Sequence, residues 1–152
     1  MIRKIRKDDR QEYIDMSKTF FKSNAISEPF VIEDEKLDYT FDLAINNSEY
    51  IDIYVYEKDN KLAGYALMSF TYSNDLGGLL ATIEELFIKK EYRGLGIGDE
   101  FMSYIESIYP EEVSAIRLEV VDENYKAKSL YEKHGFEERE YIQMIKLIDD
   151  EE

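Results

Sequence analysis

The strongest constraint on the fold is a glycine-rich loop that separates a strand-like run from a helical pattern. The run covers residues 83–88, and the loop contains Gly94, Gly96 and Gly98. Because glycine lacks a Cβ atom, successive backbone N–H groups can turn toward one oxyanion. Apolar residues at helical spacing over 97–109 place this loop at a helix N-terminus, where the dipole also favours an anion. The sequence therefore predicts a phosphate-binding loop between a strand and a helix.

Two familiar phosphate loops do not fit this spacing. A P-loop requires Gly-Lys-Ser/Thr after four spacer residues, and the dinucleotide fingerprint requires a small residue where Asp99 stands. The spacing instead resembles the Arg/Gln-x-x-Gly-x-Gly/Ala element of the GNAT superfamily of acetyl-CoA-dependent N-acetyltransferases, here as Arg93-Gly94-Leu95-Gly96-Ile97-Gly98.

The resemblance extends on both sides of the loop. Residues 83–88 are similar to the fourth strand of that family. About 30 residues after the loop, the segment from Asn124 to Phe136 resembles its Asn-x-x-Ala-x-x-x-Tyr…Gly-Phe element. Together these elements cover residues 80–137, and the chain is identified on them as a member of the GNAT superfamily.

The resemblance implies an α/β (α+β) fold of the GNAT type. Its central sheet is mixed but mostly antiparallel, with six to seven strands flanked by about four helices and a splayed parallel pair at the CoA site. The implied reaction is transfer of an acetyl group from acetyl-CoA to a primary amine, by direct attack in a ternary complex.

Hydrophobic periodicity and turn residues predict the same elements along the chain. A helix carrying Tyr13 and Phe20 is expected to be capped by Asp8 or Asp9, and Pro110 is expected to end a later helix. The expected strands are 1–7, 50–57, 61–72, 78–89 and 115–121, with one or two more in 136–148, and the expected helices follow Asp9 and span 37–45, 94–109 and 124–134.

Length and composition favour one domain. The chain has 152 residues, of which 44% are hydrophobic, so we expect a single acetyltransferase domain over 1–148 and a frayed acidic tail at 149–152. No apolar run is long enough for a membrane span, and the N-terminus lacks the apolar core of a signal peptide. These observations predict a cytoplasmic protein without a membrane partner.

Charge and residue usage exclude several kinds of site. The net charge of −15 argues against nucleic acid as a partner. The absence of cysteine excludes thiolate zinc and a cysteine nucleophile, and the single histidine, His134, cannot form a histidine-based metal site alone. The resemblance implies acetyl-CoA as cosubstrate, and this residue usage predicts no metal.

The resemblance also implies a set of CoA-binding residues. Main-chain groups near Phe87 and Ile88 would hold the pantetheine arm, and a main-chain N–H near Leu86 or Phe87 would meet the oxyanion. Arg93 has two interpretations, as a phosphate ligand or as a cap of the loop, and Asn124 combines helix capping with a pantetheine contact. The predicted CoA-binding residues are Leu86, Phe87, Ile88, Arg93, Gly94, Leu95, Gly96, Ile97, Gly98, Asn124, Ser129 and Tyr131.

Three side chains are candidates for proton transfer. The family register makes Tyr131 the general acid for the leaving thiolate, although its position alone is equally compatible with packing on a helix. An amine acceptor is protonated at neutral pH and needs a base, for which Glu84 and Glu85 are candidates. Because side chains alternate along a strand, only one of the two can face the acceptor unless a bulge intervenes. We favour Glu84, which matches the catalytic glutamate of polyamine-type relatives.

The acceptor is the least constrained part of the prediction. Residues 27–49 carry seven acidic side chains against Lys36 alone, and in the family this region walls the acceptor pocket. Two interpretations of these charges are equally open. They attract a cationic, polyamine-like small amine, or they form a solvated acidic face without a ligand role. The alternatives are a protein or peptide acceptor, through an N-terminus or a lysine, and a CoA-binding sensor without turnover. Pairing of terminal strands into a homodimer is a further expectation from the family.

Overall fold

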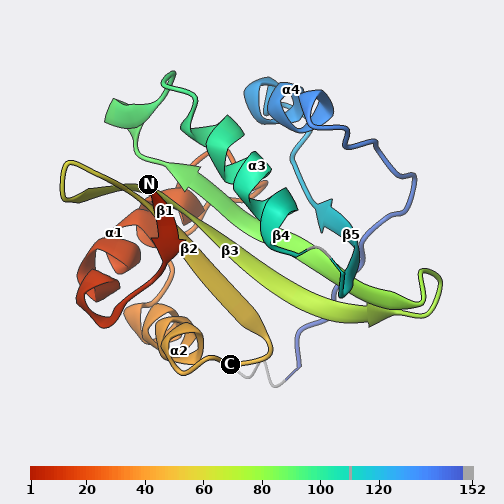
Figure 1. The fold of residues 1–152 in the computed structure, drawn as a ribbon, viewed down its shortest axis with the longest axis horizontal. Coiled ribbons are helices and arrows are strands. Elements are labelled where there is room, and N and C mark those ends of the chain that lie inside the picture. The colour runs from red at the N-terminus through yellow and green to blue at the C-terminus, as the bar shows by residue number, and fades with distance from the viewer. Residues whose placement is uncertain (110, 149–152) are drawn as a thin grey trace.

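In the described part of the chain, five strands form one sheet, and the last two strands make its only parallel pairing (Figure 1). The computed structural model describes residues 1–109 and 111–148, so Pro110 and the expected tail at 149–152 lie outside the described residues. Neighbouring strands follow the chain in the order β1-β2-β3-β4-β5. Their bounds are β1 Ile2–Lys4, β2 Ile51–Lys58, β3 Lys61–Ser73, β4 Gly78–Ile88 and β5 Val113–Leu118.

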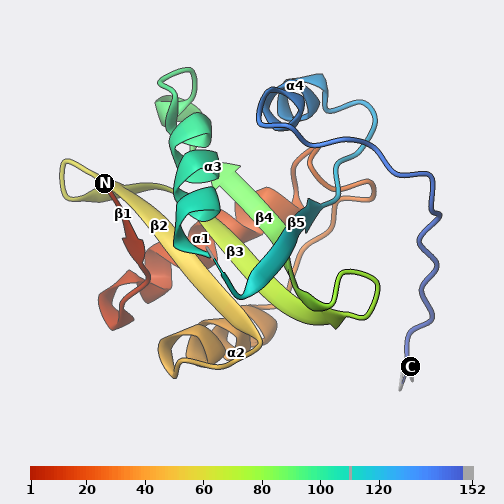
Figure 2. The same cartoon turned by 45° about the vertical axis from the view of Figure 1, so that its right-hand side comes forward.

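Helices cover both faces of the sheet (Figures 1 and 2). On one face lie α1 (Arg10–Phe21) and α2 (Asp34–Ile45), and on the other lie α3 (Ile97–Ile108) and α4 (Tyr125–Lys133). Two short 3-10 turns, η1 (Lys7–Asp9) and η2 (Lys90–Tyr92), precede α1 and the glycine loop. This arrangement confirms the predicted fold class and its four helices.

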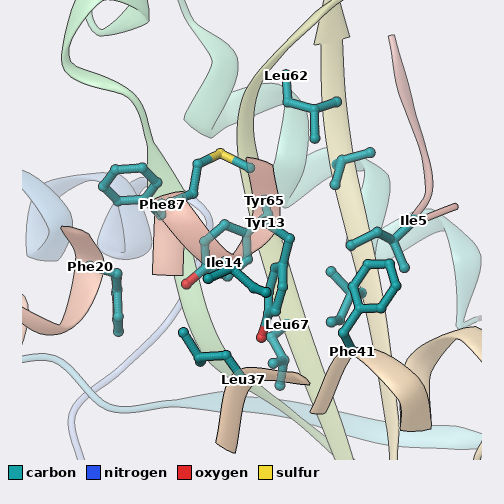
Figure 3. Packing of buried hydrophobic residues seen from close by; sticks show 13 residues of the cluster. Ile5, Tyr13, Ile14, Phe20, Leu37, Phe41, Leu62, Tyr65, Leu67 and Phe87 are labelled. Carbon is teal, nitrogen blue, oxygen red and sulfur yellow. The ribbon is translucent and has the colours of Figure 1, made fainter. Parts of the chain in front are cut away.

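Each face has its own hydrophobic core. The core under α1 and α2 is built on aromatic rings: Tyr13 lies 5.9 Å from Phe41 and 5.3 Å from Tyr65, measured between ring centroids. Figure 3 shows that both phenol oxygens point toward the end of this core where Leu37 and Leu67 lie. The core therefore places two hydroxyl groups beside apolar side chains.

The hairpin between β2 and β3 has a tight turn of the kind that its residues predict. Asp59 and Asn60 connect β2 to β3 with φ values of 53° and 61°. Two consecutive positive φ angles are typical of the two-residue hairpin turn whose twist matches that of the strands. Apart from glycine, Asn and Asp are the residues that tolerate positive φ best. The predicted hairpin is confirmed.

The start of α1 differs from the prediction in detail. Asp9 occupies the N-cap position, but its carboxylate makes no cap hydrogen bond to α1. It accepts from Arg6 N–H at 2.7 Å and from Arg3 Nη1 at 2.8 Å. The side chain therefore ties η1 to β1.

The predicted final strands are absent from the described structure, and the sheet has five strands there where six to seven were expected. Residues 136–148 form no strand, and β5 has no neighbour on its outer edge among the described residues. Alternating apolar residues favour a strand only where another strand takes their hydrogen bonds, and here the side chains of the segment are exposed. In the part of the chain described here, no helix is both long enough and apolar enough to cross a membrane.

Candidate active site

Strand β4 has a free edge at its C-terminal end. Its parallel pairing with β5 runs from Leu79↔Val113 to Ile83↔Leu118, and β5 then ends while β4 continues to Ile88. On the opposite side, β4 stays paired with β3 through Gly64↔Ile88. The two parallel strands thus separate after Ile83, as the splayed pair of the prediction requires, and main-chain groups of β4 have no strand partner there among residues 1–109 and 111–148.

The free edge presents particular main-chain groups. Ile88 O accepts a hydrogen bond of 2.9 Å from Arg93 Nε, whereas Phe87 O lies directly against Gly64 of β3. Because main-chain groups alternate in direction along a strand, Leu86 shares the free side with Ile88. Leu86 and Ile88 are therefore better placed than Phe87 to pair with a peptide-like ligand.

The glycine loop has the backbone conformation that the sequence predicted. Gly94 and Gly96 have φ values of 78° and 83°, where other residues are strained, and Gly96 is the N-cap of α3. Glu100 N–H makes its helical bond to Gly96 O at 3.1 Å, so the preceding amides of the first turn lack intrahelical partners. These donors suit a pyrophosphate group.

Gly98 has a different requirement. It has no positive φ, and a Cβ atom there would lie 3.1 Å from Leu130 Cδ2 of α4. The small residue therefore allows α3 and α4 to pack closely, which holds α4 beside the loop.

Two acidic side chains also lie in the first turn of α3, but neighbouring groups engage them. Asp99 contacts Lys133 Nζ at 2.9 Å and His134 Nε2 at 2.9 Å, and Lys133 followed by His134 lowers the pKa of Asp99. Glu100 accepts from Tyr56 Oη at 3.1 Å. These pairings link α3 to α4 and to β2.

Helix α4 carries the second predicted element. Asn124 Oδ1 accepts from Ala127 N–H at 3.3 Å, which makes it the N-cap and leaves its amide group for another contact. Burial raises the pKa of Tyr131 to about 12, and its ring lies 6.1 Å from Phe136. Ser129 is exposed on the same helix. Tyr131 therefore holds its proton at neutral pH.

A β-bulge in β4 changes the direction of the two glutamates. Leu67 of β3 pairs with Glu85, while the next residue, Met68, pairs with Ile83, so Glu84 is the extra residue. Glu84 and Glu85 consequently line the same pocket. Simple alternation would have sent one of them to the other face, and the bulge is the exception that the sequence analysis left open.

This pocket lies between the sheet and the helices α1 and α2. It has a volume of about 330 Å³, at the lower end of the ~300–1,000 Å³ typical of small-molecule sites. Apolar side chains form much of its wall, and the lining residues are Tyr13, Phe21, Ile32, Lys36, Leu37, Thr40, Leu43, Ile51, Leu67, Ser69, Glu84 and Glu85.

The two carboxylates in the pocket have different surroundings. Glu85 Oε1 accepts a 2.6 Å hydrogen bond from Tyr65 Oη, and burial raises the pKa of Glu85 to about 7, with Tyr65 lowering it and the charge of Glu84 adding to the rise. Glu84 is exposed, and its Oε2 accepts from Ser69 Oγ at 2.5 Å. Glu85 is thus the carboxylate that changes protonation near neutral pH.

The structure brings the two glutamates, the free edge of β4 and the glycine loop into one region. One strand segment, 84–88, presents two carboxylates to the pocket and a free main-chain edge beside the glycine loop. Sequence reasoning missed Tyr65, Ser69 and Lys36 as pocket residues. For the first two, the period-two pattern of β3 opposite the glutamates was the available signal.

Comparison with known proteins places these features in a family. The family model described as the acetyltransferase (GNAT) family matches residues 13–136. Thialysine N-epsilon-acetyltransferase of Bos taurus is 35% identical over 75 residues, which are 49% of this chain and 44% of the relative. The chain thus spans less than half the length of that curated relative.

Solved structures support the fold. A possible acetyltransferase from Clostridium difficile 630 superimposes with a TM-score of 0.83 at 23% identity, covering 97% of both chains. AAC(6')-Iy, solved with the bisubstrate analog CoA-S-monomethyl-acetylneamine, superimposes with a TM-score of 0.79 at 14% identity, again over 97% of both chains.

Proposed function

Because the chain belongs to the acetyltransferase (GNAT) family, we propose that it transfers an acetyl group from acetyl-CoA to a primary amine. The observation that carries this proposal is the position of Glu85. Its carboxyl group, with a pKa of about 7, lines a pocket on the same strand segment whose free edge runs beside the glycine loop.

The proposed cosubstrate site uses the main chain more than side chains. The amides of the glycine loop and of the first turn of α3 would bind the pyrophosphate, and the free edge at Leu86 and Ile88 would pair with the pantetheine arm. Arg93 is held at Ile88 O through Nε, and its remaining nitrogens extend the positive charge of the loop. Asn124 and Ser129 add polar groups from α4.

Proton transfer follows from the two titratable groups. Bound acetyl-CoA supplies the thioester carbonyl that the amine attacks. Glu85 takes the proton that the ammonium must lose, directly or through water, because a base with a pKa near the working pH is effective in both proton uptake and release. Sequence reasoning favoured Glu84, whereas its exposure and its bond to Ser69 suit a second role, attraction of the ammonium group.

The carbon–sulfur bond breaks as the new carbon–nitrogen bond forms. Tyr131 gives its proton to the departing sulfur, and the second proton lost by the nitrogen restores the Tyr131 hydroxyl. The N–H of Leu86 on the free edge would stabilise negative charge on the carbonyl oxygen, a contribution of about 3 kcal/mol in other enzymes. Direct attack in a ternary complex needs no further nucleophile from the protein.

A small cationic amine is the proposed acceptor. A pocket of about 330 Å³ that is lined by two carboxylates fits a small, positively charged amine. The bovine relative is named for acting on thialysine. A polyamine-like amine remains a candidate, and a protein lysine would present a similar side chain. A sensor without turnover would not need both Glu85 and Tyr131.

Steady-state release of CoA thiol tests the proposal. Wild-type protein is assayed with acetyl-CoA and a panel of diamines, polyamines, diamino acids and peptides, alongside Glu85→Gln and Glu84→Gln. We expect turnover with a small amine and a loss of about 10²–10⁴-fold for Glu85→Gln, against a smaller loss for Glu84→Gln. CoA binding without turnover across the panel would contradict the proposed enzyme.

A further inference from the structure

The acidic side chains of residues 27–49, a region that was expected to wall the acceptor pocket, do not line that pocket. Arg10 binds Asp38 at 2.9 Å and Asp42 at 2.7 Å, and Lys18 binds Asp34 at 2.5 Å. None of the seven acidic residues of 27–49 lines the pocket. The one charged residue of this region that does line it is Lys36.

The pocket therefore has charges of opposite sign on different elements. Glu84 and Glu85 come from β4 in the sheet, and Lys36 comes from the first turn of α2, which covers that face of the sheet. Between them the wall includes Leu37, Leu43 and Leu67, together with other apolar side chains. A ligand complementary to this pocket would carry a positive group, an aliphatic stretch and a negative group.

The charge of Lys36 is available for a ligand. Within residues 1–109 and 111–148, no carboxylate lies within ion-pair distance of its ammonium, although three other basic residues near α1 and α2 are paired: Arg10, Lys18 and Lys89. Lys36 is exposed, and Thr40, one helical turn later, lines the pocket beside it. An unpaired cation at the opening of a small pocket favours an anionic group on the molecule that enters.

We propose that the acceptor is an amino acid with a terminal amine, whose carboxylate binds Lys36 while its distant amine reaches Glu85. This inference rests on the proposed acetyl transfer and narrows its acceptor class. A simple diamine of the same length would bring its second ammonium toward Lys36, where like charges repel. Lys36 thus acts as a specificity residue that selects for a carboxylate.

L-Lysine and cadaverine form a matched pair for testing this proposal, since they differ only by the carboxylate. We expect wild-type protein to show a kcat/KM for lysine about tenfold above that for cadaverine, the size of one charge-assisted hydrogen bond. Lys36→Gln should bring this ratio toward one, and Lys36→Glu should invert it. Mass spectrometry of the product identifies which amine is acetylated.

A matched control and the opposing outcomes complete the experiment. Lys7→Gln removes another exposed lysine that does not line the pocket and should leave the ratio as in wild type. Cadaverine used as well as lysine by wild type, or an unchanged ratio in Lys36→Glu, would overturn the role of Lys36 while leaving acetyl transfer intact. Absence of thiol release with every amine would instead overturn the proposed function itself.

Discussion

Tyr65 Oη donates a 2.6 Å hydrogen bond to Glu85 Oε1 inside the pocket between α1, α2 and the sheet. The phenol is fully buried, so the bond acts away from solvent. Burial raises the pKa of Glu85 to about 7, and the bond from Tyr65 limits that rise because it stabilises the ionised carboxylate.

Tyr65→Phe should therefore move the activity profile to higher pH. Loss of a hydrogen bond to a charged group, worth about 1.5–3 kcal/mol, should raise the pKa of Glu85 by about one to two units. The acidic limb of kcat/KM against pH, which reports the free enzyme, should shift upward by that amount. Tyr54→Phe, on the opposite face beside Asp52, is the control. If the acidic limb of the profile does not shift in Tyr65→Phe, Glu85 is not the group whose ionisation controls kcat/KM.

Glu85 should also make folding stability depend on pH. Its pKa of about 7 in the folded protein exceeds the ordinary value of 4.5, so the folded state binds the proton more tightly. The free energy of unfolding from this group should then fall as pH rises from about 4.5 to about 7, by about 3 kcal/mol at most. Urea unfolding at pH 4.5 and 8 should show that Glu85→Gln gains stability relative to wild type at the higher pH only.

The exposed residue Glu84 provides the control for the unfolding measurement. Glu84→Gln, a surface substitution of the same chemistry, should change the unfolding free energy by less than about 0.5 kcal/mol at either pH. Equal pH dependence in wild type and Glu85→Gln would show that the carboxyl group is not desolvated in the folded protein.

Tyr131→Phe should separate turnover from CoA binding. The substitution keeps the ring against Phe136 and removes the proton that the leaving sulfur receives, so kcat should fall by about 10²-fold or more. Calorimetric titration with CoA should give an affinity within about twofold of wild type, because the hydroxyl adds little to ground-state binding. Equal turnover in the variant would remove Tyr131 from the chemistry.

Gly96→Ala should weaken CoA binding through the backbone. At a φ of 83°, a Cβ atom costs about 1–2 kcal/mol even though no other atom obstructs it, and relief of that strain would rotate the amides of the loop. We expect about a tenfold loss of CoA affinity by calorimetry. Gly77→Ala, with a φ of 68° and equally open space in the β3–β4 turn, imposes similar strain far from the loop and should leave CoA affinity unchanged.

The features that sequence reasoning predicted correctly are those fixed by short segments. The glycine loop, the cap at Asn124 and the turn at Asp59-Asn60 depend on the intrinsic preferences of a few adjacent residues. The bulge at Glu84 depends on the register between β3 and β4, and the position of Lys36 at the pocket depends on how α2 packs. These relationships join distant parts of the chain, so no local pattern contains them.

The expected homodimer remains a prediction, and the exposed C-terminal segment suggests how to test it. Six large apolar side chains there are between 66% and 92% exposed, and β5 presents an edge without a strand neighbour among the described residues. Apolar surface of this extent favours association, at about 25 cal/mol for each Å² buried. Light scattering should therefore show a dimer for wild type and a monomer for the combined substitution of Ile142, Met144 and Ile145 by Ser. Tyr39→Ser, which removes an exposed ring on α2, should stay dimeric, and a monomeric wild type would contradict the prediction.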